Sequence, residues 1–160
     1  MSEPPAQSWS RRLAELGIEL PAVPAPAGAY VPAVRSGSLV FTAGQVPFVD
    51  GKVAATGKVG REISPEEAKG HARTCALNAL AAVHSLAGID NVVRVVKVVG
   101  FVASAEGFTG QPAVINGASE LLGEVFGDAG QHARSAVGVA ELPLGVPVEV
   151  ELTVEVGENS

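Results

Sequence analysis

The sequence predicts a single α+β domain: a β-sheet with two main helices packed on one face, in the element order βββαβαββ. Valine and leucine alternate with polar residues along 148–156, which indicates a strand with one buried face. A sharp helix start at Ser64 opens a long stretch of apolar residues at helical spacing. Because 47% of the residues are hydrophobic and only 4% are aromatic, we expect small aliphatic side chains to fill the core between sheet and helices.

The first part of the chain is expected to form an extension rather than part of the domain. Ser10 can cap a short helix over residues 11–16, which Gly17 would end. The proline-rich segment 21–28 then favours an extended tether. We therefore divide the chain into an N-terminal extension (1–27), one domain (28–156) and a C-terminal tail (157–160).

The domain is predicted to begin with a β-meander and to continue with a long helix. Two short β-rich runs lie within residues 30–46, and Asp50 and Gly51 form a strong turn signal. Ser64 can cap the helix that follows, because a proline and two glutamates, which favour a first helical turn, come next. Apolar residues recur at helical spacing until Gly88, where the helix should end.

The second half of the domain is predicted to alternate between strands and one more helix. Residues 92–103 form a β-rich run, and residues 111–126 show a helical apolar side. Two closing strands are expected at 135–141 and 148–156. Helices placed in this way cover one side of a sheet, so the other side needs water, polar groups or a partner subunit.

Composition argues against several classes of function. The net charge of −6 and the scattering of the eleven basic residues disfavour nucleic acid as a partner. The run 92–103 is too short and too charged to span a membrane. The first residues lack the pattern of a signal peptide, and the only cysteine, Cys75, cannot form an internal disulfide, so we expect a cytoplasmic protein.

No motif for a metal or a phosphate group is recognisable in the sequence. The three histidines, His71, His84 and His132, lack a paired ligand pattern, and the glycine-rich stretch 51–60 contains no nucleotide-binding fingerprint. Cys75 lies in the apolar stripe of the first long helix, where a buried structural thiol is expected. We predict no metal and no cofactor.

Two charged residues near strand ends remain as candidates for chemistry. Arg134 opens the penultimate predicted strand, and its planar guanidinium suits bidentate binding of a carboxylate. From composition alone, an ordinary surface arginine is the favoured interpretation. Glu149 can likewise be one member of a solvated acidic face.

The C-terminal part of the chain resembles the signature of the reactive intermediate deaminase (Rid, or YjgF-like) family. Residues 134–143 match its Arg-Ser strand and Leu-Pro turn, and residues 148–151 match its Val-Glu-Ile-Glu-like strand. Further matches are Tyr30, the segment 43–47 in the third expected strand, and Asn116. The resemblance extends from about residue 28 to residue 156.

Membership of this family would imply a chorismate-mutase-like fold assembled as a homotrimer, with clefts between subunits. Family members hydrolyse reactive enamines and imines, such as 2-aminoacrylate, to a 2-keto acid and ammonia without a cofactor. By this resemblance Arg134 would bind the substrate carboxylate, Glu149 would position or relay protons, and the backbone of Ala136 would lie near the attacking water. Tyr30 would close the cleft, Gly44 would allow close backbone approach, and Asn116 would supply a polar contact.

Two positions depart from the family pattern and leave other functions open. Many active members carry Ser and Cys where this chain has Ala43 and Ala136. One alternative is therefore a non-catalytic trimer of the same fold that senses small carboxylates. Weaker alternatives are an endoribonuclease or translation inhibitor, which the acidic charge disfavours, and a chorismate mutase, since a shared fold does not transmit function.

Overall fold

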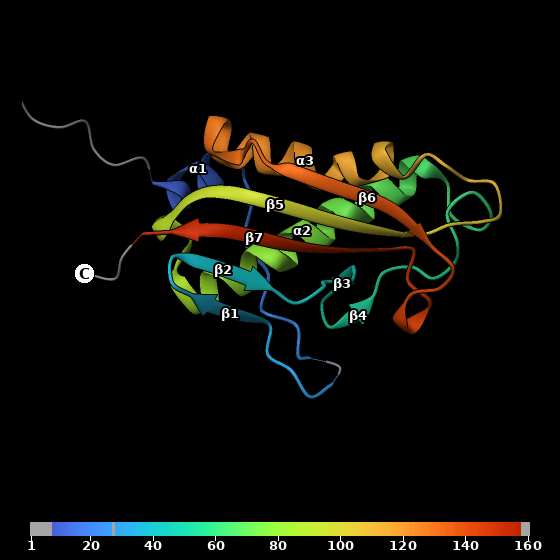
Figure 1. Ribbon diagram of the computed structural model, residues 1–160, viewed down its shortest axis with the longest axis horizontal. Helices are drawn as coiled ribbons and strands as arrows, with labels where there is room; N and C mark the ends of the chain where they lie inside the picture. Colours follow the sequence, from blue (N-terminus) through green and yellow to red (C-terminus); the bar gives the residue numbers. More distant parts are fainter. Residues whose placement is uncertain (1–7, 27, 158–160) are drawn as a thin grey trace, which may run out of the picture.

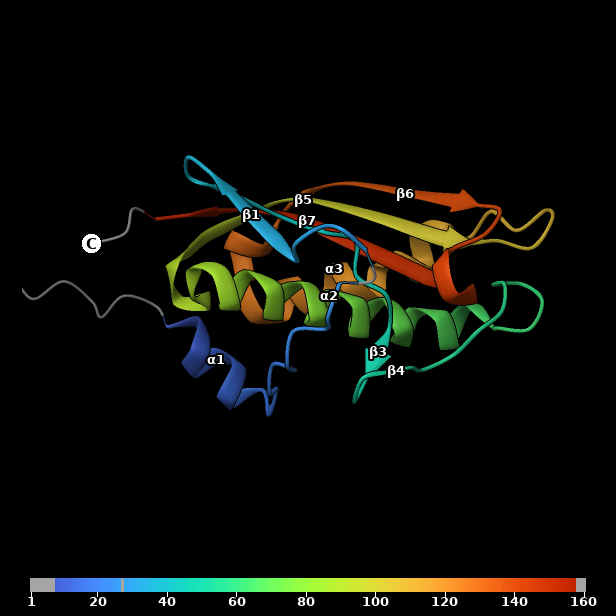
Figure 2. The ribbon, with the colours of Figure 1, turned by 90° about the horizontal axis from the view of Figure 1, so that it is seen from below.

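The computed structural model describes residues 8–26 and 28–157, and this part of the chain forms a five-stranded sheet with two long helices on one face (Figures 1 and 2). The helices are α1 (Trp9–Glu15), α2 (Pro65–Ala87) and α3 (Gln111–Phe126), with short 3-10 turns η1 (Ile89–Asn91), η2 (Gly127–Gly130) and η3 (Pro143–Gly145). The strands are β1 (Ala33–Ser36), β2 (Leu39–Thr42), β3 (Phe48–Val49), β4 (Lys52–Val53), β5 (Val92–Ala103), β6 (Ala133–Val139) and β7 (Val148–Val156).

This architecture confirms the predicted α+β class and the placement of both main helices on one side of the sheet. Helix α2 begins as expected, because the Ser64 hydroxyl accepts a hydrogen bond from the Glu67 amide at 3.1 Å. It ends at Gly88, whose positive φ of 79° favours glycine. Strands β5 and β7 and helix α3 have the predicted bounds, whereas β6 begins two residues before the predicted start at Ser135.

The sheet order is β1-β2-β7-β5-β6, so the last strand of the chain lies in the centre. Strand β7 is antiparallel to both β2 and β5, and β6 forms an edge parallel to β5. The third expected strand differs from the prediction: β3 and β4 form a separate small ladder around the turn at Asp50 and Gly51. Segment 43–47 lies between strands and reaches the main sheet through a bridge from Gln45 to Val150.

The alternation predicted for the last strand is present along its full length. Val148, Val150 and Val154 on one side of β7 are fully buried against the helices, whereas Glu149 and Glu151 on the other side are half-buried. The second side belongs to the open face of the sheet, which no helix of the described residues covers (Figure 2). The core is therefore a single apolar layer between the sheet and its two long helices.

Helix α1 packs against this core, and its N-cap residue differs from the predicted one. Its N-cap is Ser8, whose hydroxyl accepts from the Arg11 amide at 3.2 Å; Ser10, the predicted cap, instead binds Asp90 through its backbone and side chain. The Trp9 ring is 7% exposed, lies 5.1 Å from Phe126 in an edge arrangement, and donates a 2.7 Å hydrogen bond to the Val92 carbonyl. The N-terminal helix is thus held against the domain where α3 ends and β5 begins. The boundary at residue 28 stays a prediction, and most of the predicted tail lies outside the described residues.

Trp9→Ala is expected to lower the free energy of unfolding by about 3–5 kcal/mol, because it removes a buried aromatic side chain and leaves a cavity. Trp9→Phe keeps most of the apolar surface and loses the hydrogen bond, so it should cost less, about 1–3 kcal/mol. Urea denaturation measures both values. Equal stability of wild type and Trp9→Ala would contradict the packing of α1 described above.

Candidate functional site

The six residues predicted for the site fall into separate groups in the structure. Tyr30, Gly44 and Glu149 line one pocket of about 250 Å³ near β3 and η3. Arg134 and Asn116 contact each other at the edge strand β6. Ala136, which was predicted to act through its backbone, lies on the same strand as Arg134. Within one chain the structure therefore places the predicted site residues in two separate groups, one at the pocket and one at the edge strand β6.

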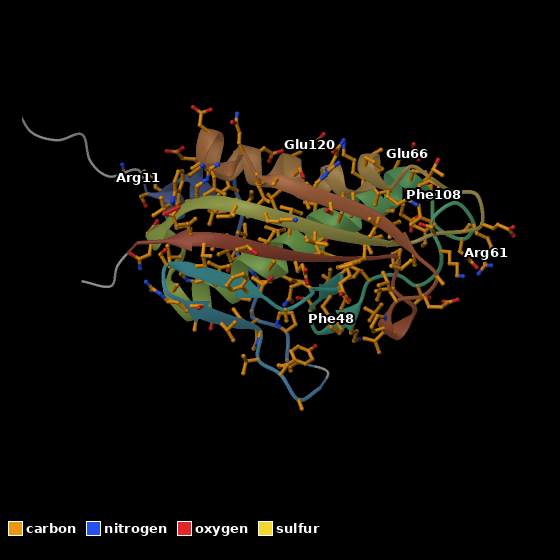
Figure 3. All side chains as sticks on the ribbon, viewed as in Figure 1. Arg11, Phe48, Arg61, Glu66, Phe108 and Glu120 are labelled. Carbon is orange, nitrogen blue, oxygen red and sulfur yellow. The ribbon has the colours of Figure 1, made fainter. Side chains whose placement is uncertain are left out.

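The pocket has mainly apolar walls. Phe48, which Figure 3 labels beside β3, is one of its lining residues. The polar side chains in the lining are those of Tyr30, Gln45 and Glu149. The apolar lining residues are Pro24, Ala25, Pro26, Pro32, Val46, Phe48, Pro143 and Leu144.

Glu149 reaches the pocket because β7 alternates and because the chain passes close beside it at Gly44. The Gln45 amide donates to the Val150 carbonyl at 2.8 Å and the Val150 amide donates back at 3.0 Å, which fixes segment 43–46 against β7. A Cβ on Gly44 would lie 2.8 Å from Cδ of Glu149 and closer still to one of its oxygens. Only glycine leaves room for the carboxylate at this position.

The environment of Glu149 changes its acidity. Burial raises the pKa of its carboxyl group above the ordinary value of 4.5, and the negative charge of Glu151 two residues along the same face raises it further. A carboxyl group shifted in this direction holds its proton nearer to neutral pH. Glu149 is therefore the residue of this pocket best suited to exchange a proton with a bound molecule.

Arg134 is half-buried between β6 and α3 rather than extended into solvent. One of its terminal nitrogens donates to Asn116 Oδ1 at 2.7 Å and to Ser119 Oγ at 3.2 Å, and the other donates to the Pro112 carbonyl at 3.3 Å. These three bonds leave about two of the five guanidinium N–H groups without an acceptor in the described part of the chain. Arg134 is thus held in place with donors to spare for a carboxylate.

Ser119 and His132 complete this cluster and were not singled out from the sequence. The Nδ1 atom of His132 lies 2.6 Å from the Gly130 carbonyl, which can only accept, so Nδ1 carries the proton. In the neutral ring Nε2 then accepts from the Ser119 hydroxyl at 2.9 Å. The three-residue spacing of Asn116 and Ser119 on one helix face was a signal available in the sequence.

The two parts of the site are too far apart in one chain to hold the same small molecule. Glu149 is paired with Phe101 and Arg134 with Val98, so β5 separates their strands. Two strand spacings amount to about 10 Å. The side chains also point to opposite faces: Arg134 contacts α3, whereas Glu149 lies on the open face.

The remaining candidate residues show structural roles or carry no polar side chain. Cys75 is buried with its sulfur 3.7 Å from the Val148 carbonyl, and burial raises the pKa of its thiol well above the ordinary value. Ala136 packs against the core, and Ala43 is half-buried. Among the described residues no group of His, Cys, Asp and Glu could hold a metal ion.

No helix in residues 8–26 and 28–157 has the length and apolar character needed to cross a membrane.

Comparison with known sequences identifies one family and several relatives. The family model described as Endoribonuclease L-PSP matches residues 21–156. Protein TCP17 of Trypanosoma cruzi is 46% identical over 145 residues, which cover 89% of this chain and 91% of that protein. The 2-iminobutanoate/2-iminopropanoate deaminase of Salmonella typhimurium is 35% identical over 128 residues, covering 80% of this chain and 88% of the relative.

Solved structures share the fold. The crystal structure of protein Atu1372 from Agrobacterium tumefaciens superimposes with a TM-score of 0.84 at 44% identity, covering 94% of each chain. The structure of Escherichia coli TdcF with bound serine gives a TM-score of 0.64 at 27% identity, covering 84% of this chain and 94% of that one.

Gly44→Ala is expected to destabilise the protein by about 1–3 kcal/mol, because the added methyl group must displace the Glu149 carboxylate or segment 43–46. The same substitution should cost much less when Glu149 is replaced by alanine, since the group that it would meet is then absent. Urea denaturation of the two single variants and the double variant measures this coupling.

Gly70→Ala provides a control, because a Cβ at this helical position meets nothing within 4 Å. It should stabilise the protein by about 0.5–1 kcal/mol. If the changes in stability caused by Gly44→Ala and Glu149→Ala add up in the double variant, the close approach of Gly44 to the Glu149 carboxylate does not constrain either residue.

Proposed function

The chain belongs to the Endoribonuclease L-PSP family, the Rid (YjgF-like) family that its sequence resembles, and on this basis we propose that it is a cofactor-independent hydrolytic deaminase. Its proposed substrates are reactive enamines and imines of the 2-aminoacrylate type, which it converts to a 2-keto acid and ammonia. The observation that carries the proposal is a half-buried carboxyl group with a raised pKa, Glu149, held in a mainly apolar pocket beside Gly44. The names of relatives agree with this chemistry, because one is a 2-iminobutanoate/2-iminopropanoate deaminase.

The proposal requires a homotrimer in which each site combines two protomers. The open face of the sheet supports this assembly, since Phe41 and Val137 are 39% and 45% exposed there. Val137 lies in one row with Phe101 and Glu149 across the sheet. A second copy packed on this face would bury these apolar side chains, and the proposed assembly brings the edge strand β6 of that copy, with Arg134, beside the pocket of its neighbour.

In the proposed mechanism Arg134 binds the carboxylate of the substrate through its two remaining donors. The contacts to Asn116 and Ser119 hold the guanidinium in one orientation, so little freedom is lost on binding. Serine bound to the related TdcF is a small amino acid with such a carboxylate. Tyr30, half-exposed at the pocket, would close the site over the ligand.

Glu149 and a water molecule would carry out the hydrolysis. An enamine first takes a proton on carbon and becomes the imine. Water, held near the backbone of Ala136, then adds to the imine carbon, and the nitrogen is protonated to give a carbinolamine. The nitrogen leaves as ammonia when the new C=O bond forms, and Glu149 transfers the protons between oxygen and nitrogen. Hydrolysis of an imine needs little more than this positioning.

A second candidate function is binding of a small carboxylate without turnover. Ala43 and Ala136 favour it, because neither side chain can donate a hydrogen bond to the attacking water or the leaving group. Binding of RNA is disfavoured on electrostatic grounds, since Glu149, Glu151 and Glu155 share the open face of β7 and would repel phosphate groups. Calorimetry with small carboxylates distinguishes a binding protein, which releases heat of binding without forming product.

Arg134→Ala is expected to lower kcat/KM for 2-aminoacrylate by about 100-fold, because the carboxylate loses its oriented partner. A pyridoxal-phosphate-dependent serine dehydratase generates the substrate, and pyruvate release above the spontaneous rate is measured. Arg134→Lys should recover only part of the activity, since an ammonium group cannot bind in a bidentate manner.

Arg73→Ala is the matched control, because Arg73 pairs with Glu124 at 3.4 Å on the helix side of the molecule. It should keep the wild-type rate. No acceleration of pyruvate release by the wild-type protein would rule out the deaminase, and an equal rate for wild type and Arg134→Ala would remove Arg134 from the mechanism.

A further inference from the structure

His132 is half-buried near Arg134 and has no role in the proposed mechanism. It directly precedes β6 and is two residues before Arg134, so the alternation of an extended chain turns both side chains to the same side, toward α3. Ser119 comes from α3, three residues after Asn116 on the same helix face. All of these side chains reach one small space between the edge strand and the helix.

The hydrogen bonds in this space start from the backbone of Gly130. This residue is buried at the end of η2, and a Cβ there would collide with the Leu122 carbonyl of α3, so only glycine fits. The close packing fixes the Gly130 carbonyl relative to α3. His132 Nδ1 lies 2.6 Å from that carbonyl and donates its proton to it, which sets the orientation of the ring.

The hydrogen bonds that follow run in one direction. With its proton on Nδ1, the neutral ring of His132 offers Nε2 as an acceptor, and the Ser119 hydroxyl donates to it at 2.9 Å. The lone pairs of Ser119 Oγ then remain for Arg134, whose Nη1 donates to them at 3.2 Å. A chain of three hydrogen bonds therefore leads from the Gly130 backbone to the guanidinium.

This chain of bonds determines which donors of Arg134 stay free. The two N–H groups of Nη1 have two acceptors on α3, Asn116 Oδ1 and Ser119 Oγ, and Nη2 donates to the Pro112 carbonyl. Within the described residues, Nε–H and the second N–H of Nη2 then have no acceptor. Donors on these two nitrogens can bind both oxygens of one carboxylate.

Without His132 the Ser119 hydroxyl would turn to a different partner. A serine inside a helix can donate to the carbonyl of the preceding turn, which is the acceptor that remains. That rotation moves Oγ away from Arg134, and one N–H of Nη1 loses its acceptor. The guanidinium would then adopt more than one orientation, and only a fraction of the protein would be ready to bind a carboxylate.

We propose that His132 is a positioning residue of this site: through Ser119 it fixes Arg134 in the orientation that presents two free donors to a substrate carboxylate. The inference rests on the proposed deaminase function and adds to it a residue that acts only through other side chains. His132 sets the fraction of the protein that is ready to bind, and the chemistry at Glu149 does not depend on it.

His132→Leu and His132→Gln form the matched pair of variants. Leucine fills similar space and accepts no hydrogen bond, so His132→Leu should lower kcat/KM for 2-aminoacrylate and the affinity for pyruvate by the same factor, about tenfold. The amide oxygen of glutamine can accept from Ser119, so His132→Gln should keep both values within about twofold of wild type. The pyruvate-release assay and calorimetry with pyruvate measure them.

Double variants show whether His132 acts through Ser119 and Arg134. Ser119→Ala should cause the same loss as His132→Leu, and the two together should lose no more than either alone. In the Arg134→Ala background, His132→Leu should have no further effect. His71→Leu is the control, because Nε2 of this α2 histidine makes no hydrogen bond within the described residues, and it should keep the wild-type values.

The outcomes separate this inference from the function on which it rests. Pyruvate binding without faster pyruvate release would reject the deaminase, and the affinities of the variants for pyruvate would still decide the role of His132. Wild-type values in His132→Leu, an equal loss in His132→Gln, or a further loss in the Arg134→Ala background would overturn that role and leave the deaminase standing. A wild-type protein that neither binds pyruvate nor accelerates its release would overturn both.

Discussion

The structure depends on one constraint: two long helices cover only one face of a five-stranded sheet. The central strand β7 alternates so that its valines fill the core and its glutamates lie on the open face. An open face with half-buried acids and exposed apolar side chains is a poor surface to leave in water. We propose that a neighbouring copy of the chain covers this face, and the proposed function depends on that arrangement.

The same constraint divides the candidate site. Glu149 lies on the open face of β7, and Arg134 lies on the helix side of β6, so one chain presents the proposed proton-exchanging group and the proposed carboxylate-binding group at different places. Each half is already ordered: Gly44 leaves room for the glutamate, and Asn116 and Ser119 hold the arginine. In the proposed assembly these two preformed halves would come together with little rearrangement.

Local signals in the sequence were sufficient to predict the long helices and strands. They were insufficient to predict which strands pair with one another. The cap at Ser64, the glycine at residue 88 and the alternation along β7 depend on neighbouring residues, and the structure confirms them. The choice of Ser8 over Ser10 as the cap of α1 depends on Asp90, which is distant in sequence and binds Ser10. The sheet order also arises from distant contacts, so the separation of Glu149 from Arg134 could not be predicted from spacing.

Each site is proposed to take Arg134 from one protomer and Glu149 from another, and a mixing experiment tests this sharing most directly. Arg134→Ala and Glu149→Gln, each expected to have low activity alone, are prepared separately and then unfolded and refolded together, with native mass spectrometry to verify mixed trimers. Random assembly should restore about a quarter of the sites, because some interfaces then combine an intact arginine with an intact glutamate. Mixed trimers that remain as inactive as the separate variants would contradict the account.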